Sequence, residues 1–224
     1  MSRKFWIGLL LSVFGCRLSA QDQDSRFAGA SIGIATLSAD AQARVTPDLG
    51  ALSSYKPENG LALNVFGGAH LNDYFSLQGN YIWNSNSLTL TSARFSGAGS
   101  AFYQQMRASS QHSVIADALL YFRNRQSWAR PYLSAGTGVV HFGSSAIGGP
   151  VIQSGLELPP QRSSSNGIAL RVAVGLDLRV ADGWALRYSF SETLRGNPVS
   201  INLSPAGERN LANFQNLLGV VRSF

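Results

Sequence analysis

The sequence has little cysteine and little charge, and each shortage excludes a class of protein. Its single cysteine, Cys16, allows neither a disulfide framework nor a cysteine metal site. Charged residues make up 13% of the chain, against roughly 25% in ordinary soluble domains. The sequence has no basic run either, so nucleic acid is not expected as a partner. Such a composition is typical of a protein with little side-chain surface in water.

Long apolar runs are also missing after residue 20, where no stretch reaches the ~18 apolar residues of a membrane-spanning helix. Insertion of this part of the chain into a bilayer would therefore need β-strands, whose backbone groups pair with neighbouring strands. We find no phosphate-binding loop, metal-ligand spacing or dinucleotide motif. We therefore expect no cofactor and no metal.

Residues 1–20 differ from the rest of the chain. Two basic residues precede an apolar run, and the small residue Ala20 follows it. This order predicts a secretory signal peptide over residues 1–20, with residues 21–224 as the exported domain. A lipoprotein signal with an acylated Cys16 is the alternative, which the bulky Phe14 disfavours.

Arginine dominates the positive charge of the exported domain. Without the three basic residues of the predicted signal, the 18 basic residues fall to 15, against 12 acidic ones, and Lys56 is the only lysine among them. Because arginine binds phosphate through two parallel hydrogen bonds, we expect lipopolysaccharide headgroups as one partner. The alternative is that the arginines fill an interior and extend along its rims.

The clearest pattern lies in residues 167–194, where every second residue is large and apolar. These residues are Ile168, Leu170, Val172, Val174, Leu176, Leu178 and Val180, followed by Trp184, Leu186, Tyr188 and Phe190. The residues between them are small or polar, which predicts a β-hairpin with two different faces. Keeping both apolar sets on one face places Val180 opposite Trp184, with Gly183 at positive φ in the turn.

The apolar face of this hairpin predicts contact with lipid. It is about ten residues long and begins with an aromatic residue, as in strands that cross a bilayer at a tilt. The polar face then points into a barrel, where the same register places Asp177 opposite Arg187. The predicted charged residues of the lumen are Asp117, Arg171, Asp177, Arg179 and Arg187. We expect such a group of charged side chains to plug the lumen and not to line an open pore.

The same alternation recurs along the chain and predicts eight strands. They cover residues 27–37, 61–71, 75–83, 113–123, 130–142, 168–180, 184–194 and 211–224, with long loops at 38–60, 84–112, 143–166 and 195–210. Long and short connections alternate, as in outer-membrane barrels with brief periplasmic turns and extended outer loops. We therefore predict an all-β fold, an eight-stranded antiparallel up-and-down transmembrane β-barrel whose interior is filled by side chains.

The second predicted long loop, residues 84–112, carries several large apolar residues. They are Phe95, Phe102, Tyr103 and Met106. They either form a surface patch that binds a partner or pack the loop onto itself, and we favour packing.

Two motifs resemble a known family. Residues 217–224 end in Phe224, with Leu218 and Val220 on the same face. This resembles the last strand of bacterial outer-membrane barrels, whose final aromatic residue is read by the assembly machinery. The segment Arg130-Pro131-Tyr132, followed by alternating glycines, is similar to the fifth strand of small OmpA-like or opacity-type barrels. The resemblance implies an integral protein of the bacterial outer membrane, without the peptidoglycan-binding domain of larger OmpA-type proteins.

A catalytic site is not expected. His112 and Ser113 are adjacent, so they point to opposite sides of a strand and cannot form a nucleophile–base pair. His141 could approach Glu192, but the alternation places Glu192 on the lipid side. The His-x-Ser pattern of lipid A deacylases is absent, and His70 at a periplasmic end is interpreted as structural.

The fold alone does not decide the function. The leading hypothesis is a non-enzymatic surface barrel whose four long loops mediate adhesion to an extracellular ligand or a cell surface. A narrow passive channel is the main alternative, and a lipid A-modifying enzyme a weaker one. A soluble lipocalin-type barrel, with the apolar side chains inside, is the alternative fold.

Overall fold

The structure is a computed structural model that describes residues 25–38, 42–46, 49–96, 99–153, 161–196 and 210–224. The predicted signal peptide and the alternative acylation site at Cys16 lie outside the described residues. Within the described residues, no helix is long and apolar enough to cross a membrane.

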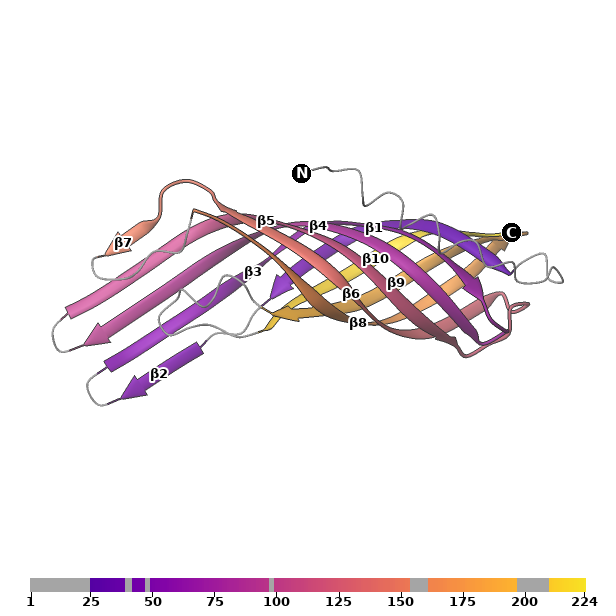
Figure 1. The fold of residues 1–224 in the computed structure, drawn as a ribbon, viewed down its shortest axis with the longest axis horizontal. Coiled ribbons are helices and arrows are strands. Elements are labelled where there is room, and N and C mark those ends of the chain that lie inside the picture. Colours follow the sequence, from indigo (N-terminus) through magenta and orange to yellow (C-terminus); the bar gives the residue numbers. More distant parts are fainter. Residues whose placement is uncertain (1–24, 39–41, 47–48, 97–98, 154–160, 197–209) are drawn as a thin grey trace, which may run out of the picture.

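In the described parts of the chain, eight strands form a closed antiparallel ring (Figure 1). They are β1 (Arg26–Ser38), β3 (Leu49–His70), β4 (Phe75–Ser96), β5 (Gly99–Tyr121), β6 (Ala129–Ala146), β8 (Arg162–Ala181), β9 (Trp184–Gly196) and β10 (Asn210–Ser223). Two short strands, β2 (Gln42–Thr46) and β7 (Val151–Gln153), pair with β3 and β5. Strand β1 pairs with β10 on one side and with β3 on the other, which closes the ring. The predicted eight-stranded antiparallel barrel is confirmed.

The two faces of the wall follow the predicted alternation. Val172 and Val174 are 52% and 48% exposed, whereas Arg171 and Ala173, which alternate with them, are 3% and 7% exposed. On the partner strand, Leu186 is exposed and Arg187 is buried. The lipocalin-type arrangement is therefore wrong, because the apolar side chains cover the outside of the ring. This wall is the surface that contacts lipid.

The hairpin of β8 and β9 has the predicted register except at its turn. Asp177 lies opposite Arg187, as predicted. The prediction that Val180 pairs with Trp184 is wrong, because the register shifts next to Val180 and Ala181 takes the place opposite Trp184. The extra residue forms a bulge that the period-two pattern cannot reveal. Gly183 has the expected positive φ, 69°.

The predicted long loops are wrong over much of their length. Strand β3 already begins at Leu49, β4 and β5 continue through most of residues 84–112, and β8 begins at Arg162. In these extensions serine, threonine, asparagine and glutamine occupy many of the outward positions, so the apolar signal of a strand is lost although the backbone pairing continues. Of the fourth predicted loop, residues 197–209 lie outside the described part.

A row of outward polar side chains marks where the apolar wall ends. Three pairs bridge neighbouring strands at this level: Thr36 with Asn59 at 2.6 Å, Tyr81 with His112 at 2.8 Å, and His141 with Asn166 at 2.7 Å. We call these six residues the polar rim. Below the rim the outward residues of β8 run from Ile168 to Val180 and are apolar. The strands above it extend beyond the membrane, most visibly β3, β4 and β5 (Figure 1).

The orientation of the wall predicts how depth changes the effect of a charge. Val174→Arg would place a guanidinium near the middle of the apolar wall and lower the free energy of unfolding by about 2–4 kcal/mol. Ser164→Arg, on the same face of β8 but above the polar rim, should change it by about 0–1 kcal/mol. Urea unfolding in phospholipid vesicles measures both values. Equal effects of the two substitutions would contradict the assignment of the wall.

Candidate functional site

The lower half of the lumen is organised around Arg187 of β9. This side chain is 3% exposed. Its Nε and one terminal nitrogen donate to the two carboxylate oxygens of Asp177, both at 2.6 Å, and its other terminal nitrogen donates to Oε1 of Gln78 at 2.6 Å. A bidentate pair of this kind fixes the guanidinium in orientation as well as in position. Arg187 thereby connects β8 and β9 with β4 across the lumen.

Aromatic rings enclose the same guanidinium. The Tyr121 hydroxyl accepts a hydrogen bond from Arg187 at 2.8 Å and donates one to Asp177 at 3.0 Å. The centres of the Phe66, Tyr132 and Phe27 rings lie 4.8, 5.1 and 5.6 Å from the guanidinium carbon. These distances are within the range of cation–π attraction. The charge is thus neutralised by one carboxylate and surrounded by ring faces.

A second ion pair lies deeper in the lumen, between Arg171 of β8 and Asp117 of β5. The strand between them contributes Gly136, which lies opposite both residues in the two registers. A Cβ at this position would overlap the Asp117 carboxylate and the backbone carbonyl oxygen of Ala116. The absence of a side chain at Gly136 therefore leaves the space through which Arg171 reaches Asp117.

Polar side chains of β4 connect the two ion pairs. Gln78, which accepts from Arg187, donates to Oδ1 of Asn80 at 2.7 Å. Asn80 in turn donates to the Asp117 carboxylate at 3.1 Å. We call these residues, with the two ion pairs and Tyr121, the lumen network. Four of the five predicted lumen charges belong to it. Alternation along β4 turns Gln78 and Asn80 inward, but only the structure shows that they join the two pairs.

The fifth predicted lumen charge, Arg179, lies elsewhere. Its side chain is exposed at the periplasmic end of β8 and donates to the backbone carbonyl of Arg125. The alternation correctly gives its side of the strand but cannot tell that this position lies at the periplasmic mouth, two residues before β8 ends. Arg179 is therefore a residue of the periplasmic mouth and not of the lumen.

An apolar cluster fills the outer mouth of the barrel. It is formed by Leu37, Leu88, Leu90, Tyr103, Phe142 and Leu211, which come from five strands and are at most 3% exposed. Burial raises the pKa of the Tyr103 phenol above its ordinary value, and the opposing effect of nearby Arg107 is smaller. The Tyr103 hydroxyl donates a hydrogen bond to Gln105 at 2.5 Å. We call this group the outer apolar cluster. Sequence analysis missed it because Leu88, Leu90 and Tyr103 fell in a predicted loop.

The three histidines are spread over the barrel. His112 and His141 are part of the polar rim and face outward, whereas Ser113 is buried inside the lumen. His70 lies at the periplasmic end of β3, where its Nδ1 is 2.6 Å from the Ser76 hydroxyl. Glu192 lies between Val172 and Phe214 in the outward rows. Within the described residues, no group of three His, Cys, Asp or Glu side chains could hold a metal ion.

Above the polar rim, β3, β4 and β5 continue side by side as a projecting sheet (Figure 1). We call residues 49–57, 84–96 and 99–111 the outer sheet. Leu52, Phe95 and Met106 are 40%, 58% and 50% exposed on it, whereas Tyr103 turns inward into the outer apolar cluster. Residues 84–112 therefore divide between the two interpretations that the sequence allowed, because Tyr103 packs while Phe95 and Met106 remain exposed.

The position of Gly136 predicts a specific loss of stability. Gly136→Ala should push Asp117 away from Arg171 and lower the free energy of unfolding by about 3 kcal/mol, the low end of the range for breaking a buried ion pair. Gly143→Ala on the same strand is the matched control, because its Cβ would meet only the Ser110 hydroxyl at an ordinary 3.5 Å. Urea titration of both variants provides the comparison. Equal stabilities would show that the pair does not depend on the space at Gly136.

Several solved structures are similar to this chain. Neisserial surface protein A is 16% identical, with a TM-score of 0.51 over 89% of this chain and 97% of its own. OprG from Pseudomonas aeruginosa is 11% identical, with a TM-score of 0.47 over 92% of this chain and 99% of its own. Ail, the attachment invasion locus protein of Yersinia pestis, is 13% identical, with a TM-score of 0.46 over 90% and 99%.

No curated protein sequence matches the chain. A family model described as the outer membrane protein beta-barrel domain matches residues 8–224, which includes every strand of the ring. The match agrees with the closed antiparallel sheet, its apolar outer wall and its polar interior. The chain belongs to the outer membrane protein β-barrel family.

Proposed function

We propose that this protein is a non-enzymatic surface barrel that binds an extracellular partner through its outer sheet, in the manner of an adhesin. The observation that carries the proposal is the exposure of Leu52, Phe95 and Met106 beyond the polar rim. Lipid cannot cover these side chains there, and exposed apolar groups on an ordered surface favour contact with another molecule. Paired strands of the outer sheet therefore occupy much of the sequence that was predicted to form long loops.

Pairing within the outer sheet supports a preformed binding surface. Leu52 lies opposite Ala93, which lies opposite Phe102, and Thr89 lies opposite Met106. On the inward side of the outer sheet, the outer apolar cluster packs the strands of this sheet against the other strands of the ring. A surface held in this way loses little conformational entropy when it binds.

The positions of the histidines favour a role without catalysis. His112 donates to or accepts from Tyr81, and His141 pairs with Asn166, so that each imidazole has a neighbour in the polar rim. Neither is directed toward a buried serine, as a nucleophile–base pair requires. His70 does contact the buried Ser76, but this pair lies at the periplasmic end, away from the outer sheet. We assign His112 and His141 to the membrane boundary.

Two further partners belong to the same proposal. Exposed Lys56 lies on the outer part of β3, just above Asn59 of the polar rim, where it can approach the phosphate groups of lipopolysaccharide. Phe224 is 57% exposed at the periplasmic end, and its backbone pairs with that of Arg26. Its ring is therefore accessible to the assembly machinery that the family resemblance implies.

Point substitutions on the outer sheet test the proposed adhesion. Leu52→Ser, Phe95→Ser and Met106→Ser combined should lower attachment of barrel-expressing bacteria to epithelial monolayers, to matrix-coated plastic or to one another by about a hundredfold, since three buried side chains at ~1 kcal/mol each contribute ~3 kcal/mol to binding. Adherent cells are counted at equal surface expression. Exposed Gln104, on the same face, provides the control Gln104→Ser.

Substitution is a sharper test than deletion of residues 84–112. That deletion would remove Leu88, Leu90 and Tyr103 from the outer apolar cluster and alter the barrel itself. Unchanged attachment of the triple variant on all three surfaces would refute the outer sheet as the binding surface. Equal losses in the triple variant and in Gln104→Ser would also count against it.

The same proposal makes the barrel a closed support and not a channel. The lumen network crosses the lumen, and the outer apolar cluster lies at its outer mouth. An ion would have to break a buried ion pair and cross an apolar constriction, both of which are costly. We expect no conductance steps from the purified protein in planar bilayers. Reproducible single-channel steps that follow the protein concentration would support the narrow passive channel instead.

A further inference from the structure

Two polar side chains interrupt the apolar wall on neighbouring strands. Glu192 of β9 is half-buried, and its neighbours in the outward rows are apolar. These neighbours are Val172, Phe190, Leu194 and Phe214. Asn216 of β10 is exposed on the same side and lies opposite Phe190. An ionisable side chain that faces the membrane interior is costly, and it indicates a function.

The register of the ring shows how deep Glu192 lies. The line of paired residues that passes through it starts at Thr36 of the polar rim and, after one turn of the ring, ends at Arg26 at the periplasmic end of β1. Such lines descend from β1 through β10 to β9, because the strands of a barrel are tilted. Glu192, which is two strands away from Thr36, therefore lies below the polar rim and inside the wall.

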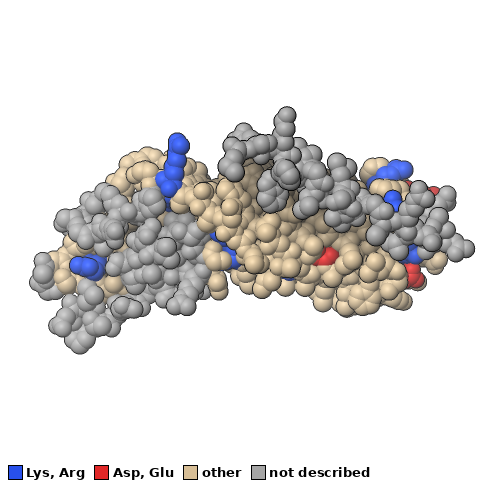
Figure 2. Space-filling view, in the orientation of Figure 1, with Lys and Arg blue, Asp and Glu red and all other residues tan. Residues whose placement is uncertain are grey.

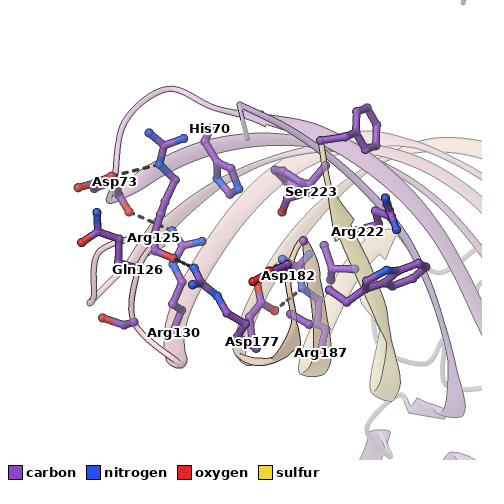
Figure 3. Close-up of a pocket in the computed structure, with 18 residues that line it drawn as sticks. His70, Asp73, Arg125, Gln126, Arg130, Asp177, Asp182, Arg187, Arg222 and Ser223 are labelled. Atoms are coloured by element: carbon purple, nitrogen blue, oxygen red, sulfur yellow. Dashed lines mark hydrogen bonds and ion pairs between the residues drawn. The ribbon is translucent and has the colours of Figure 1, made fainter. Parts of the chain in front are cut away.

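Arg222 and Trp184 mark the periplasmic end of the wall on the same two strands. They lie opposite each other, and the guanidinium carbon of Arg222 is 4.9 Å from the Trp184 ring centre. Figure 3 shows Arg222 at this end, apart from the Asp177–Arg187 pair in the lumen. The outward residues of β10 between Asn216 and Arg222 are apolar. Asn216 and the carboxylate on β9 thus lie at a depth where lipid provides only acyl chains.

The two polar side chains offer an acceptor and a donor at nearly the same depth. Because the register descends from β10 to β9, Glu192 lies lower than Phe214 and almost level with Asn216, the next outward residue below Phe214. Oδ1 of Asn216 accepts a hydrogen bond from the Tyr188 hydroxyl at 2.9 Å. Within the described residues, the Glu192 carboxylate and Nδ2 of Asn216 have no hydrogen-bond partner. Lipid tails supply none either.

Two stacked aromatic rings lie between these groups. The ring centres of Phe190 and Phe214 are 6.3 Å apart, and their planes meet at 16°. Phe214 lies above Asn216 on β10, and Phe190 lies below Glu192 on β9. We call these four residues the wall patch. When two copies with the same orientation in the membrane meet about a two-fold axis through the patch, β9 of one faces β10 of the other. Each Glu192 then faces Asn216 of the second copy.

We propose that the wall patch is a dimer interface between two copies of this chain, in which each Glu192 accepts a hydrogen bond from Nδ2 of Asn216 in the other copy. This match favours a second copy over lipid, because acyl chains carry no donor and lipid headgroups lie at the edges of the wall. The stacked rings supply the apolar contact at the centre, and hydrogen bonds inside a membrane add to association. The interface lies on the membrane wall and does not depend on adhesion by the outer sheet.

Fluorescence energy transfer in phosphatidylcholine vesicles tests the interface. Full chains labelled with a donor or an acceptor dye at the amino terminus should show transfer that rises with the protein-to-lipid ratio. Glu192→Leu and Asn216→Leu should each raise the dissociation constant of the dimer by about thirtyfold, because each removes both symmetric hydrogen bonds. The double variant should be no weaker than either single variant, since the same two bonds are lost. Heat-modifiable migration checks that each barrel has folded.

Glu192→Gln and Thr137→Leu are the matched controls. Glu192→Gln keeps an acceptor oxygen and should stay within about threefold of the unchanged chain. Thr137 is an exposed polar residue on the outward face of β6, away from the wall patch, so Thr137→Leu should stay within about twofold. Transfer that does not rise with the protein-to-lipid ratio would overturn the proposal. So would an equal loss in Thr137→Leu, or additive losses in the double variant.

Cysteine cross-linking in the same vesicles locates the contact. Phe190→Cys places a thiol close to the proposed two-fold axis, so oxidation with copper phenanthroline should give disulfide-linked dimers. Val114→Cys is the control, because Val114 is 49% exposed on β5, at the far side of the ring from β9 and β10. Equal yields from the two variants would contradict the wall patch as the interface.

Discussion

Backbone amides that cross hydrocarbon must find their hydrogen-bond partners within the protein, because lipid offers none. In this chain the requirement is met by pairing β1 with both β3 and β10, so that the part of the sheet inside the membrane has no free edge. The closed ring then fixes the direction of every side chain. Alternate residues face lipid and must be apolar, and the others face a narrow interior that they have to fill. The wall in Figure 2 reflects this division, since most of the charged side chains visible on its described surface lie toward the two ends.

The narrow interior explains why charge is concentrated on so few residues. A buried carboxylate is tolerated only when a cation and further donors neutralise it. Asp177 receives three hydrogen bonds from Arg187 and Tyr121, and Asp117 is paired with Arg171 and Asn80. The side-chain oxygen of Gln78 accepts from Arg187 and its nitrogen donates to Asn80, so the two ion pairs belong to one network across the lumen. A change at any of its members would disturb the others, in contrast to an isolated surface pair.

The two ends of the barrel differ in what they offer to other molecules. At the outer end, continued strand pairing carries Phe95 and Met106 beyond the polar rim, where they meet water or a partner. At the periplasmic end, five arginines and three aspartates line a pocket. The filled lumen separates the two surfaces, and each can therefore be altered without the other.

The amino-acid sequence by itself determined the strands inside the membrane, the face of each residue and the pairing of Asp177 with Arg187, because a period of two needs only local alternation to be read. It also indicated that Asp117 and Arg171 lie inside the ring. Only the tertiary structure decided that Gly136 separates the Asp117–Arg171 pair, that Arg179 lies at the exposed periplasmic mouth and that residues 84–112 are mostly strand. These features depend on which strands become neighbours and where their pairing stops. Hydrogen bonds between segments distant in the sequence determine which strands are neighbours and where their pairing stops. The alternation of residues along a single strand contains no information about these bonds.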